Sequence, residues 1–255
     1  MRGWLLLQVR LFFTALMFFT RLPIPAWVGY SERWLNQSGR YFPLVGLLVG
    51  GIGAAVWWLA QLLWLPPLAV LLSMAATILV TGAFHEDGWA DCCDAFGGGW
   101  GKEQVLRIMK DSRLGTFGVV GIGLLLALKF FALTALPVAL LPLVIIAGHG
   151  LSRFATVTVI YSQQYVRDDL GSKAKPLARQ ISPAELGLAG LFGLLPLLWL
   201  PGRFWLFLLP VFLARWLLGR YFFRRIGGYT GDCLGAVQQL SEVVFYLSVV
   251  GVGVS

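Results

Sequence analysis

The chain has 255 residues, of which 58% are hydrophobic and only 13% charged, with a formal net charge of +8. Soluble globular proteins contain roughly 25% charged residues, so this composition excludes an ordinary soluble domain. The apolar residues lie in long Leu-rich runs without period-two alternation. This pattern predicts membrane-spanning helices rather than a β-barrel.

The first 25 residues form an apolar segment, MRGWLLLQVRLFFTALMFFTRLPIP. Arg10 interrupts the apolar run, and no small-residue cleavage site precedes Arg21, so the pattern does not favour a signal peptide. We expect a retained helix that is interfacial or only shallowly inserted in the membrane.

Seven further apolar runs have lengths compatible with membrane crossing, which takes about 20 mainly apolar residues. They are residues 42–65, 66–84, 117–136, 137–161, 184–200, 204–219 and 234–254. The predicted fold class is therefore all-α: a polytopic integral membrane protein with about seven transmembrane helices plus the N-terminal interfacial helix. No linker interrupts the pattern, so residues 1–255 are expected to form a single domain.

Four longer polar segments separate these runs, at residues 21–41, 85–116, 162–183 and 220–233. Threading the chain back and forth across the membrane puts all four on the same side. They contain most of the Lys and Arg residues, whereas the opposite turns contain only Arg203. Because positive charge marks the cytoplasmic side, we expect this face, and any active site on it, to lie in the cytoplasm.

The segment HEDGWADCCD at residues 85–94 is the strongest candidate site. Asp87, Asp91 and Asp94 stand at i, i+4 and i+7, so on a helix their carboxylates share one face. Three carboxylates this close resist joint ionisation, and a divalent cation would relieve that conflict. Oxygen ligands suit Mg²⁺, Mn²⁺ or Ca²⁺. The alternative, a solvated acidic face, is disfavoured because the flanking aromatic residues place the segment near the bilayer.

The other polar residues of this segment are harder to assign. His85 could be a general base, a phosphate contact or an interfacial residue that caps the preceding span. Glu86 lies on a different helical face from the three Asp residues and is a weaker candidate ligand. Cys92 and Cys93 are adjacent and Cys233 is distant, which supports neither a disulfide framework nor a zinc site.

A second polar strip, KDSRLGT, occupies residues 110–116. Lys110 and Arg113 could hold phosphate oxygens, and Asp111 could join the metal site or the catalytic machinery. The strip could equally be a basic cluster that flanks the membrane, or Arg107 and Asp111 could pair at i, i+4 on a helix. Spacing alone does not decide between these interpretations.

A third strip, GGYTGD at residues 227–232, precedes the last apolar run. A Gly-rich loop that enters a helix presents unpaired N–H groups to an anion, so Gly231 and Asp232 are candidate substrate contacts. Asp232 could instead be only the N-cap of the helix.

Several ionisable residues fall within the apolar runs, where such groups are functional candidates. His149 and Arg153 lie toward the cytoplasmic end of their run, and Arg153 could bind an anionic substrate. We expect Lys129 to snorkel toward the membrane surface and Arg215 to pair with a buried carboxylate such as Glu242.

These features together suit phosphoryl or nucleotidyl transfer. A metal ion would neutralise a diphosphate, and a carboxylate outside the metal site could deprotonate an attacking hydroxyl group. The positive net charge favours anionic substrates and anionic lipid. The chain has no P-loop signature and no nucleic-acid-binding module, so nucleic acid is not an expected partner.

Five stretches of this sequence resemble the cobalamin synthase family, also called adenosylcobinamide-GDP ribazoletransferases or cobalamin-5′-phosphate synthases. They are FFTRLPIP at 18–25, YFPLVGLLVG at 41–50, TGAFHEDGWADCCDAFGG at 81–98, RIMKDSRLGTFG at 107–118 and GGYTGDCLGAVQQLSE at 227–242. They extend over essentially the whole chain, and their combination is specific although each stretch alone would be weak.

The resemblance implies a multi-pass enzyme of the cell inner membrane that acts late in the assembly of the vitamin B12 nucleotide loop. Such enzymes join adenosylcobinamide-GDP to α-ribazole or its 5′-phosphate with Mg²⁺, giving adenosylcobalamin or its 5′-phosphate and GMP. The metal ligands would come from Asp87, Asp91 and Asp94, and Asp111 and Asp232 match motif positions. Membrane lipid is a further expected partner, and assembly into homo-oligomers stays open.

Two other functions compete with this one. The acidic segment also resembles that of CDP-alcohol phosphotransferases, but Phe84 stands where their first Asp would be, and no Ala-Arg pair follows Gly88. A cation transporter would need carboxylates near the middle of the bilayer, whereas the Asp residues here lie at a helix end.

Overall fold

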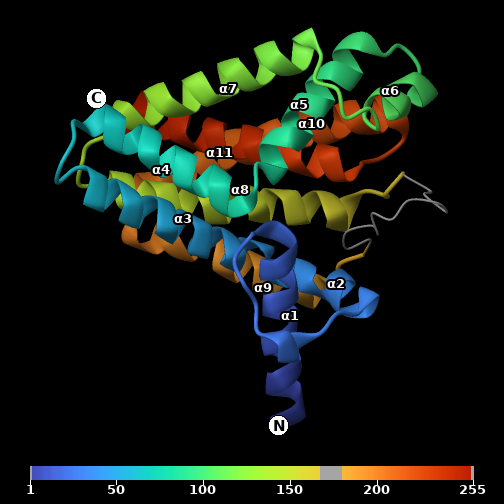
Figure 1. Ribbon diagram of the computed structural model, residues 1–255, viewed down its shortest axis with the longest axis horizontal. Helices are drawn as coiled ribbons and strands as arrows, with labels where there is room; N and C mark the ends of the chain where they lie inside the picture. Colours follow the sequence, from blue (N-terminus) through green and yellow to red (C-terminus); the bar gives the residue numbers. More distant parts are fainter. Residues whose placement is uncertain (1, 167–179, 254–255) are drawn as a thin grey trace.

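The computed structural model describes residues 2–166 and 180–253 (Figure 1). These residues form helices and four short 3₁₀ turns, with no strand among them, which confirms the all-α prediction. The helices are α1 (Arg2–Phe19), α2 (Glu32–Ser38), α3 (Phe42–Ala60), α4 (Pro66–Thr81), α5 (Phe84–Gly98), α6 (Lys102–Ile108), α7 (Thr116–Thr134), α8 (Leu141–Ser162), α9 (Pro183–Leu194), α10 (Leu208–Ile226) and α11 (Gly231–Gly253). The 3₁₀ turns are Ala26–Val28, Gly39–Tyr41, Leu195–Trp199 and Gly202–Phe207.

Five helical stretches among the described residues are long and apolar enough to cross a membrane, which confirms a multi-pass membrane protein. They are Glu32–Ala60, Thr116–Thr134, Leu141–Ser162, Gly202–Ile226 and Gly231–Gly251. Helices α4 and α5, with 16 and 15 residues, are each too short to be a candidate alone and make a sixth candidate only together. The chain bends by 88° between them. The predicted run at 184–200 forms the shorter apolar helix Pro183–Trp199. The predicted count of about seven spans compares with five or six candidate spans in the described residues. It included the run at 66–84, which is a candidate only together with α5, and the run at 184–200, which forms the short helix.

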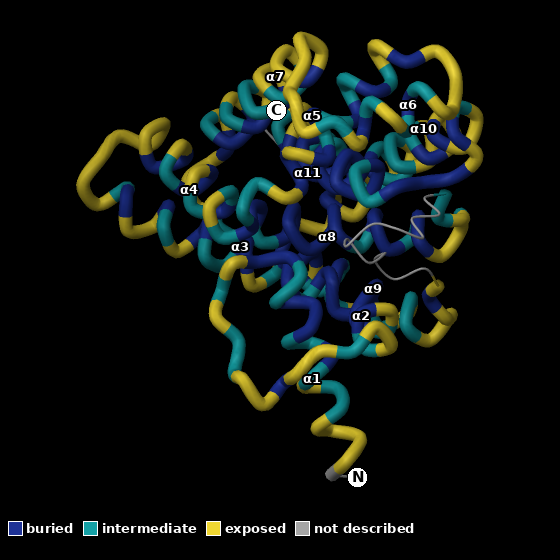
Figure 2. Tube along the Cα trace, turned by 45° about the vertical axis from the view of Figure 1, so that its right-hand side comes forward, coloured by how far each residue is buried: buried dark blue, intermediate teal, exposed yellow. Residues whose placement is uncertain are grey.

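Helices α8 and α11 form the centre of the bundle. About three quarters of each spanning stretch is buried, 78% for α8 and 72% for α11, against 22% for the stretch that contains α10. Helix α3 packs against α8, and α11 packs against both α5 and α8. Figure 2 shows the same arrangement, with buried backbone along α8 and α11 and exposed backbone at the periphery. A close approach at Gly50 allows the α3–α8 contact, because a Cβ atom there would lie 2.8 Å from the Cα atom of Ile146.

The bend between α4 and α5 depends on two consecutive left-handed residues. Gly82 has φ +67° and Ala83 has φ +59°, and Ala83 is the only described residue other than glycine with a positive φ. Left-handed backbone ends a helix, so α4 stops here and α5 starts in a new direction. The backbone N–H of Arg21 donates to the carbonyl of Val80 at 2.8 Å, which ties the N-terminal segment to this bend. The bend therefore sets the direction of the helix that carries the acidic segment.

Candidate functional site

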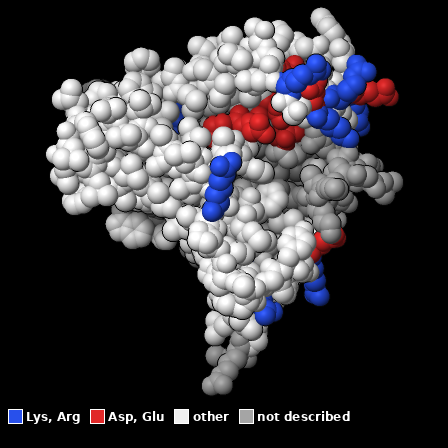
Figure 3. All heavy atoms as spheres, in the orientation of Figure 1, with Lys and Arg blue, Asp and Glu red and all other residues white. Residues whose placement is uncertain are grey.

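Helix α5 presents a strip of carboxylates on one face, as the spacing predicts. The helix is continuous from Phe84 to Gly98, so Asp87, Asp91 and Asp94 lie along one side of it. Asp87 is exposed and the other two are partly exposed. Figure 3 shows a band of acidic atoms where α5 lies, with Lys and Arg atoms at one end of the band. We call these three residues the acidic strip.

The carboxylate of Asp94 binds the beginning of α7. Its Oδ2 accepts a hydrogen bond from the backbone N–H of Gly115 at 2.7 Å, and its Oδ1 accepts from Gly118 at 2.8 Å. A negative charge that accepts from the first N–H groups of a helix stabilises that helix end. This contact fastens the KDSRLGT strip to α5, so the second motif lies against the first.

Within the KDSRLGT strip, Asp111 pairs with Arg113. The Nη2 and Nε atoms of Arg113 donate to the Asp111 carboxylate at 2.6 and 3.0 Å. These hydrogen bonds lower the pKa of Asp111 to about 2. Helix α6 ends at Ile108, so the helical i, i+4 arrangement that would pair Arg107 with Asp111 does not form. Arg113 in this pair is exposed, and so is the neighbouring Lys110.

The third motif contacts α5 through glycine. A Cβ atom on Gly88 would lie 2.9 Å from the carbonyl oxygen and 3.1 Å from the Cα of Asp232, and one on Gly235 would lie 3.3 Å from the Cα of Gly88. The contact at Gly88 leaves no room for a side chain, and the contact at Gly235 is tighter than most Cβ contacts. The beginning of α11, including Gly231 and Asp232, therefore lies directly beside the acidic strip.

The N-cap of α11 is Thr230 rather than Asp232. The Thr230 Oγ1 accepts a hydrogen bond from the backbone N–H of Cys233 at 3.3 Å, and its carbonyl accepts from Leu234 at 3.2 Å. The alternative in which Asp232 serves only as the cap is therefore wrong. Asp232 is partly exposed at the second position of the helix, and its Oδ2 lies 3.5 Å from the hydroxyl of Thr230.

The Gly-rich loop before α11 is held by the segment after α8. The N–H of Tyr229 donates to the carbonyl of Gln164, and the N–H of Val166 donates to the carbonyl of Tyr229, each at 3.0 Å. These bonds make a short parallel bridge between Tyr165 and Tyr229. Because both backbone groups of Tyr229 are bound, the loop has a defined position next to α5.

A second polar cluster lies inside the bundle, apart from the acidic strip. The Nζ of Lys129 on α7 lies 2.5 Å from Oε1 of Glu242 on α11, and both side chains are almost fully buried. Glu242 also accepts from Gln238 at 2.6 Å and from Tyr246 at 3.1 Å, and the Nδ1 of His149 lies 3.6 Å from its other oxygen. Buried membrane charges require such partners.

This cluster corrects two predictions from the sequence. Lys129 does not snorkel, because its side chain is 2% exposed and pairs with Glu242. Arg215 does not pair with Glu242, because its guanidinium donates to the carbonyl of Thr158 and the hydroxyl of Ser162. Lys129 is the only Lys within the apolar runs, and Glu242 is one of two Glu residues there, so the rule that intramembrane charges pair with one another could have pointed to this pair.

Two of the predicted site residues, His85 and Arg153, lie inside the protein rather than on the acidic strip. The ring of His85 is 4% exposed and stacks on Phe19, with centroids 5.5 Å apart. Arg153 is 2% exposed and donates to the carbonyl of His149 at 3.0 Å. The carboxylate of Glu86 also faces the interior, where it accepts from Gln239 at 2.9 Å, in keeping with its low rank as a metal ligand.

The acidic strip fits Mg²⁺ in its donor chemistry, although not as a three-carboxylate cage. Among residues 2–166 and 180–253, no three His, Cys, Asp or Glu side chains converge closely enough to hold a metal ion. Both oxygens of Asp94 already accept backbone hydrogen bonds. Mg²⁺ usually binds proteins through one or two carboxylates and takes its remaining ligands from water and substrate phosphates. Asp87 and Asp91 have the carboxylate chemistry that such a site uses.

Comparison with known proteins agrees with these three converging motifs. The family model described as cobalamin-5-phosphate synthase matches residues 11–250, which is nearly the whole chain. The chain belongs to this family. The resemblance seen in the sequence motifs, and the expectation that the chain is an enzyme of this family, are therefore confirmed.

Two relatives illustrate how close the similarity is. A protein of Shewanella frigidimarina named adenosylcobinamide-GDP ribazoletransferase is 52% identical over 254 residues, which cover 97% of each chain. A protein of Ralstonia pickettii with the same name is 49% identical over 236 residues, which cover 91% of each chain. No solved structure matches this chain.

Proposed function

We propose that this family member joins adenosylcobinamide-GDP to α-ribazole or its 5′-phosphate in a Mg²⁺-dependent reaction that releases GMP. The observation that carries the proposal is the convergence of the three motifs on α5. Asp94 binds the beginning of α7, and Gly88 contacts the beginning of α11. Carboxylates, exposed cations and a helix N-terminus thus surround one surface, as a diphosphate substrate requires.

Each part of this surface has a role in the proposed reaction. Asp87 and Asp91 would hold Mg²⁺, which when bound neutralises the charge that develops on the diphosphate. Lys110, Arg113 and the N–H of Gly231 would bind phosphate oxygens. A ribazole hydroxyl attacks the phosphorus that carries the cobinamide group. The bond from that phosphorus to GMP breaks, and the hydroxyl proton passes to a carboxylate that does not bind metal.

Three other predicted site residues have a structural role in this proposal. Asp94 positions the KDSRLGT strip, and the buried side chains of His85 and Arg153 pack inside the bundle. We propose further that the protein lies in the inner membrane with the acidic strip facing the cytoplasm. The support is the concentration of Lys and Arg in the polar segments on this side of the bundle.

The direct test uses the purified protein in lipid nanodiscs. GMP release is measured from adenosylcobinamide-GDP with α-ribazole or its 5′-phosphate, in Mg²⁺ or in EDTA. We expect release only with a ribazole acceptor and Mg²⁺. A CDP-activated alcohol ester serves as the competing substrate, and turnover of that ester instead would contradict the proposal.

A further inference from the structure

Helix α10 carries a stripe of exposed side chains at the edge of the bundle. Only 22% of its spanning stretch is buried, the smallest share among the five spanning stretches of the described residues. Leu209, Leu213, Trp216, Arg220 and Arg224 recur every three or four residues, so they share one face of the helix. All five are exposed. We call these five residues the α10 stripe.

The α10 stripe points away from the rest of the protein. The buried residues of the helix lie on its opposite face and are Val211, Gly219, Phe222 and Ile226. Arg225, on a third side, donates to the carbonyl of Gly99 at 2.5 Å and so faces the segment that follows α5. The stripe therefore faces neither the core nor α5, and it meets the lipid that surrounds a spanning helix.

The character of the stripe changes from apolar to basic along the helix. Leu209 and Leu213 come first, Trp216 follows, and Arg220 and Arg224 come last, close to the end of the span Gly202–Ile226. About 20 residues cross the hydrocarbon of a bilayer, so a span that begins at Gly202 brings the two arginines to its boundary. Trp and Arg side chains at this depth reach the lipid headgroups.

No acidic side chain neutralises the two arginines of the stripe. Helix α10 contains no Asp or Glu, and neither arginine has an ion pair in the part of the chain that the structure describes. By contrast, Arg40 before α3 pairs with Glu185, and Arg113 before α7 pairs with Asp111. Like charges one helical turn apart repel each other, and an anion from outside the protein would relieve this repulsion.

Trp216 restrains one of these arginines. The Cζ atom of Arg220 lies 5.8 Å from the centroid of the Trp216 ring, which is within the range of a cation–π contact. The contact holds a long and flexible side chain on the stripe. Less conformational entropy is then lost when the guanidinium binds an anion.

The order of groups along the stripe matches an anionic phospholipid. Its acyl chain fits Leu209 and Leu213, and its phosphate fits two guanidinium groups at the depth of the headgroups. A soluble anion would use the arginines but not the leucines. A second copy of this chain, packed through the same face, would bring its arginines against these two, and like charges would oppose that contact.

We infer that the α10 stripe binds an anionic phospholipid. The lipid phosphate lies on Arg220 and Arg224, and one acyl chain lies along Leu209 and Leu213. The site is on a different helix from the acidic strip, and the inference does not depend on the proposed reaction.

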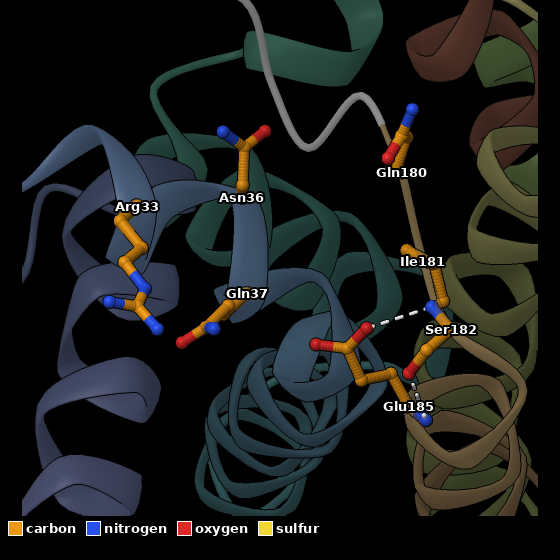
Figure 4. Close-up of a pocket in the computed structure, with 7 residues that line it drawn as sticks. All are labelled: Arg33, Asn36, Gln37, Gln180, Ile181, Ser182 and Glu185. Carbon is orange, nitrogen blue, oxygen red and sulfur yellow. Dashed lines mark hydrogen bonds between the residues drawn. The ribbon is translucent and has the colours of Figure 1, made fainter.

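Two other arginines provide a matched control. Arg33 and Arg107 are exposed and lie in the polar segments that contain most of the Lys and Arg residues. Figure 4 shows Arg33 with Asn36 and Gln37 of the same helix at a polar pocket, so amides rather than leucines accompany this arginine. Replacing both control arginines removes the same charge as replacing both arginines of the stripe.

The test measures lipid binding to the purified full-length protein in detergent by native mass spectrometry. The protein is titrated with phosphatidylglycerol or with phosphatidylcholine of the same acyl chains, and wild type should bind phosphatidylglycerol more tightly. Arg220→Gln with Arg224→Gln should raise the Kd for phosphatidylglycerol about 30-fold, which is about 2 kcal/mol at 1.4 kcal/mol per tenfold change. Arg33→Gln with Arg107→Gln should leave this Kd unchanged.

A third variant and a soluble competitor complete the test. Trp216→Leu changes no charge and should raise the same Kd about 2- to 5-fold through loss of the cation–π contact. Glycerol phosphate should not displace the lipid, and every variant should unfold at the wild-type midpoint because the replaced side chains are exposed.

Four results would overturn the inference. Equal Kd values for the two lipids in wild type would show that the lipid charge is not recognised. Equal weakening in both double variants would show that binding is a general attraction to positive charge. Displacement by glycerol phosphate would assign the arginines to a soluble anion. A lowered unfolding midpoint in the Arg220 and Arg224 variant would show that these arginines stabilise the bundle itself.

Discussion

Gly88 of α5 and Asp232 of α11 approach so closely that a Cβ atom on Gly88 would lie 2.9 Å from the Asp232 carbonyl oxygen. The contact is with backbone, which cannot rotate away as a side chain can. It sets the distance between the acidic strip and the first N–H groups of α11. Any side chain at Gly88 must therefore push apart two of the three motifs that form the surface.

The first prediction tests this contact with Gly88→Ala. A displacement of about 1 Å at a reacting centre can lower a rate about 100-fold, so we expect GMP release to fall between about 10- and 100-fold. Gly51→Ala is the matched control, because a Cβ atom at Gly51, in α3, meets nothing within 4 Å. Equal activity in the two variants, measured by initial rates of GMP release, would show that the close approach is not required.

The second prediction separates the roles of Asp94 and Asp87. Asp94→Ala removes two hydrogen bonds to a helix N-terminus, so it should lower the free energy of unfolding by about 1–3 kcal/mol. Asp87→Asn should leave stability unchanged, because Asp87 is exposed. Thermal unfolding in detergent measures both. Equal unfolding midpoints for Asp94→Ala and wild type would contradict the capping role.

The third prediction concerns the buried ion pair between Lys129 and Glu242. Lys129→Met or Glu242→Gln alone leaves one charge without its partner inside the bundle, which typically costs about 3–5 kcal/mol. The double variant should lose less than the sum of the two single variants, because they share one interaction. Chemical unfolding of the four proteins measures this coupling. Additive losses would mean that the two side chains act independently.

The fourth prediction concerns the pH dependence of the exposed pair of Asp111 and Arg113. Arg113 lowers the pKa of Asp111 to about 2, so Asp111 stays ionised at pH 3 and the pair persists there. A lowered carboxyl pKa gives a contribution that is complete above the ordinary pKa, about 3.9, and is lost as the pH falls toward 2. Arg113→Gln should return the Asp111 pKa toward about 3.9. Carboxyl ¹³C NMR titration of Asp-labelled protein measures this, with Asp111→Asn assigning the signal; an unchanged pKa would contradict the pairing.

The sequence predicted the acidic strip well because helical spacing alone determines which side chains share a face. A continuous helix is enough to place Asp87, Asp91 and Asp94 on one face. The alternating topology predicted that the KDSRLGT strip before α7 and the GGYTGD strip at the start of α11 would lie on the same side as the acidic strip. The structure brings both into contact with α5. Local periodicity together with the number of apolar runs was therefore enough to predict that these three motifs lie close together.

Other features depend on contacts that leave no pattern in the sequence. The partners of Asp94 are backbone N–H groups 21 and 24 residues away, and any residue type supplies a backbone N–H. The bend at the end of the predicted run at 66–84 relies on Ala83 in a left-handed conformation that alanine rarely adopts. The burial of His85 and Arg153 follows from how α5 and α8 rotate in the bundle, which only the packing determines.

The most direct test of the central claim measures GMP release against Mg²⁺ concentration for wild type, Asp87→Asn and Asp111→Asn. We expect Asp87→Asn to insert and unfold like wild type but to lose about 100-fold or more in rate, because changes around metal ligands already reduce activity 10- to about 100-fold. Asp111→Asn, which changes a carboxylate off the acidic strip, should keep wild-type dependence on Mg²⁺. Full Mg²⁺-dependent activity in Asp87→Asn would contradict a metal-dependent active site on α5.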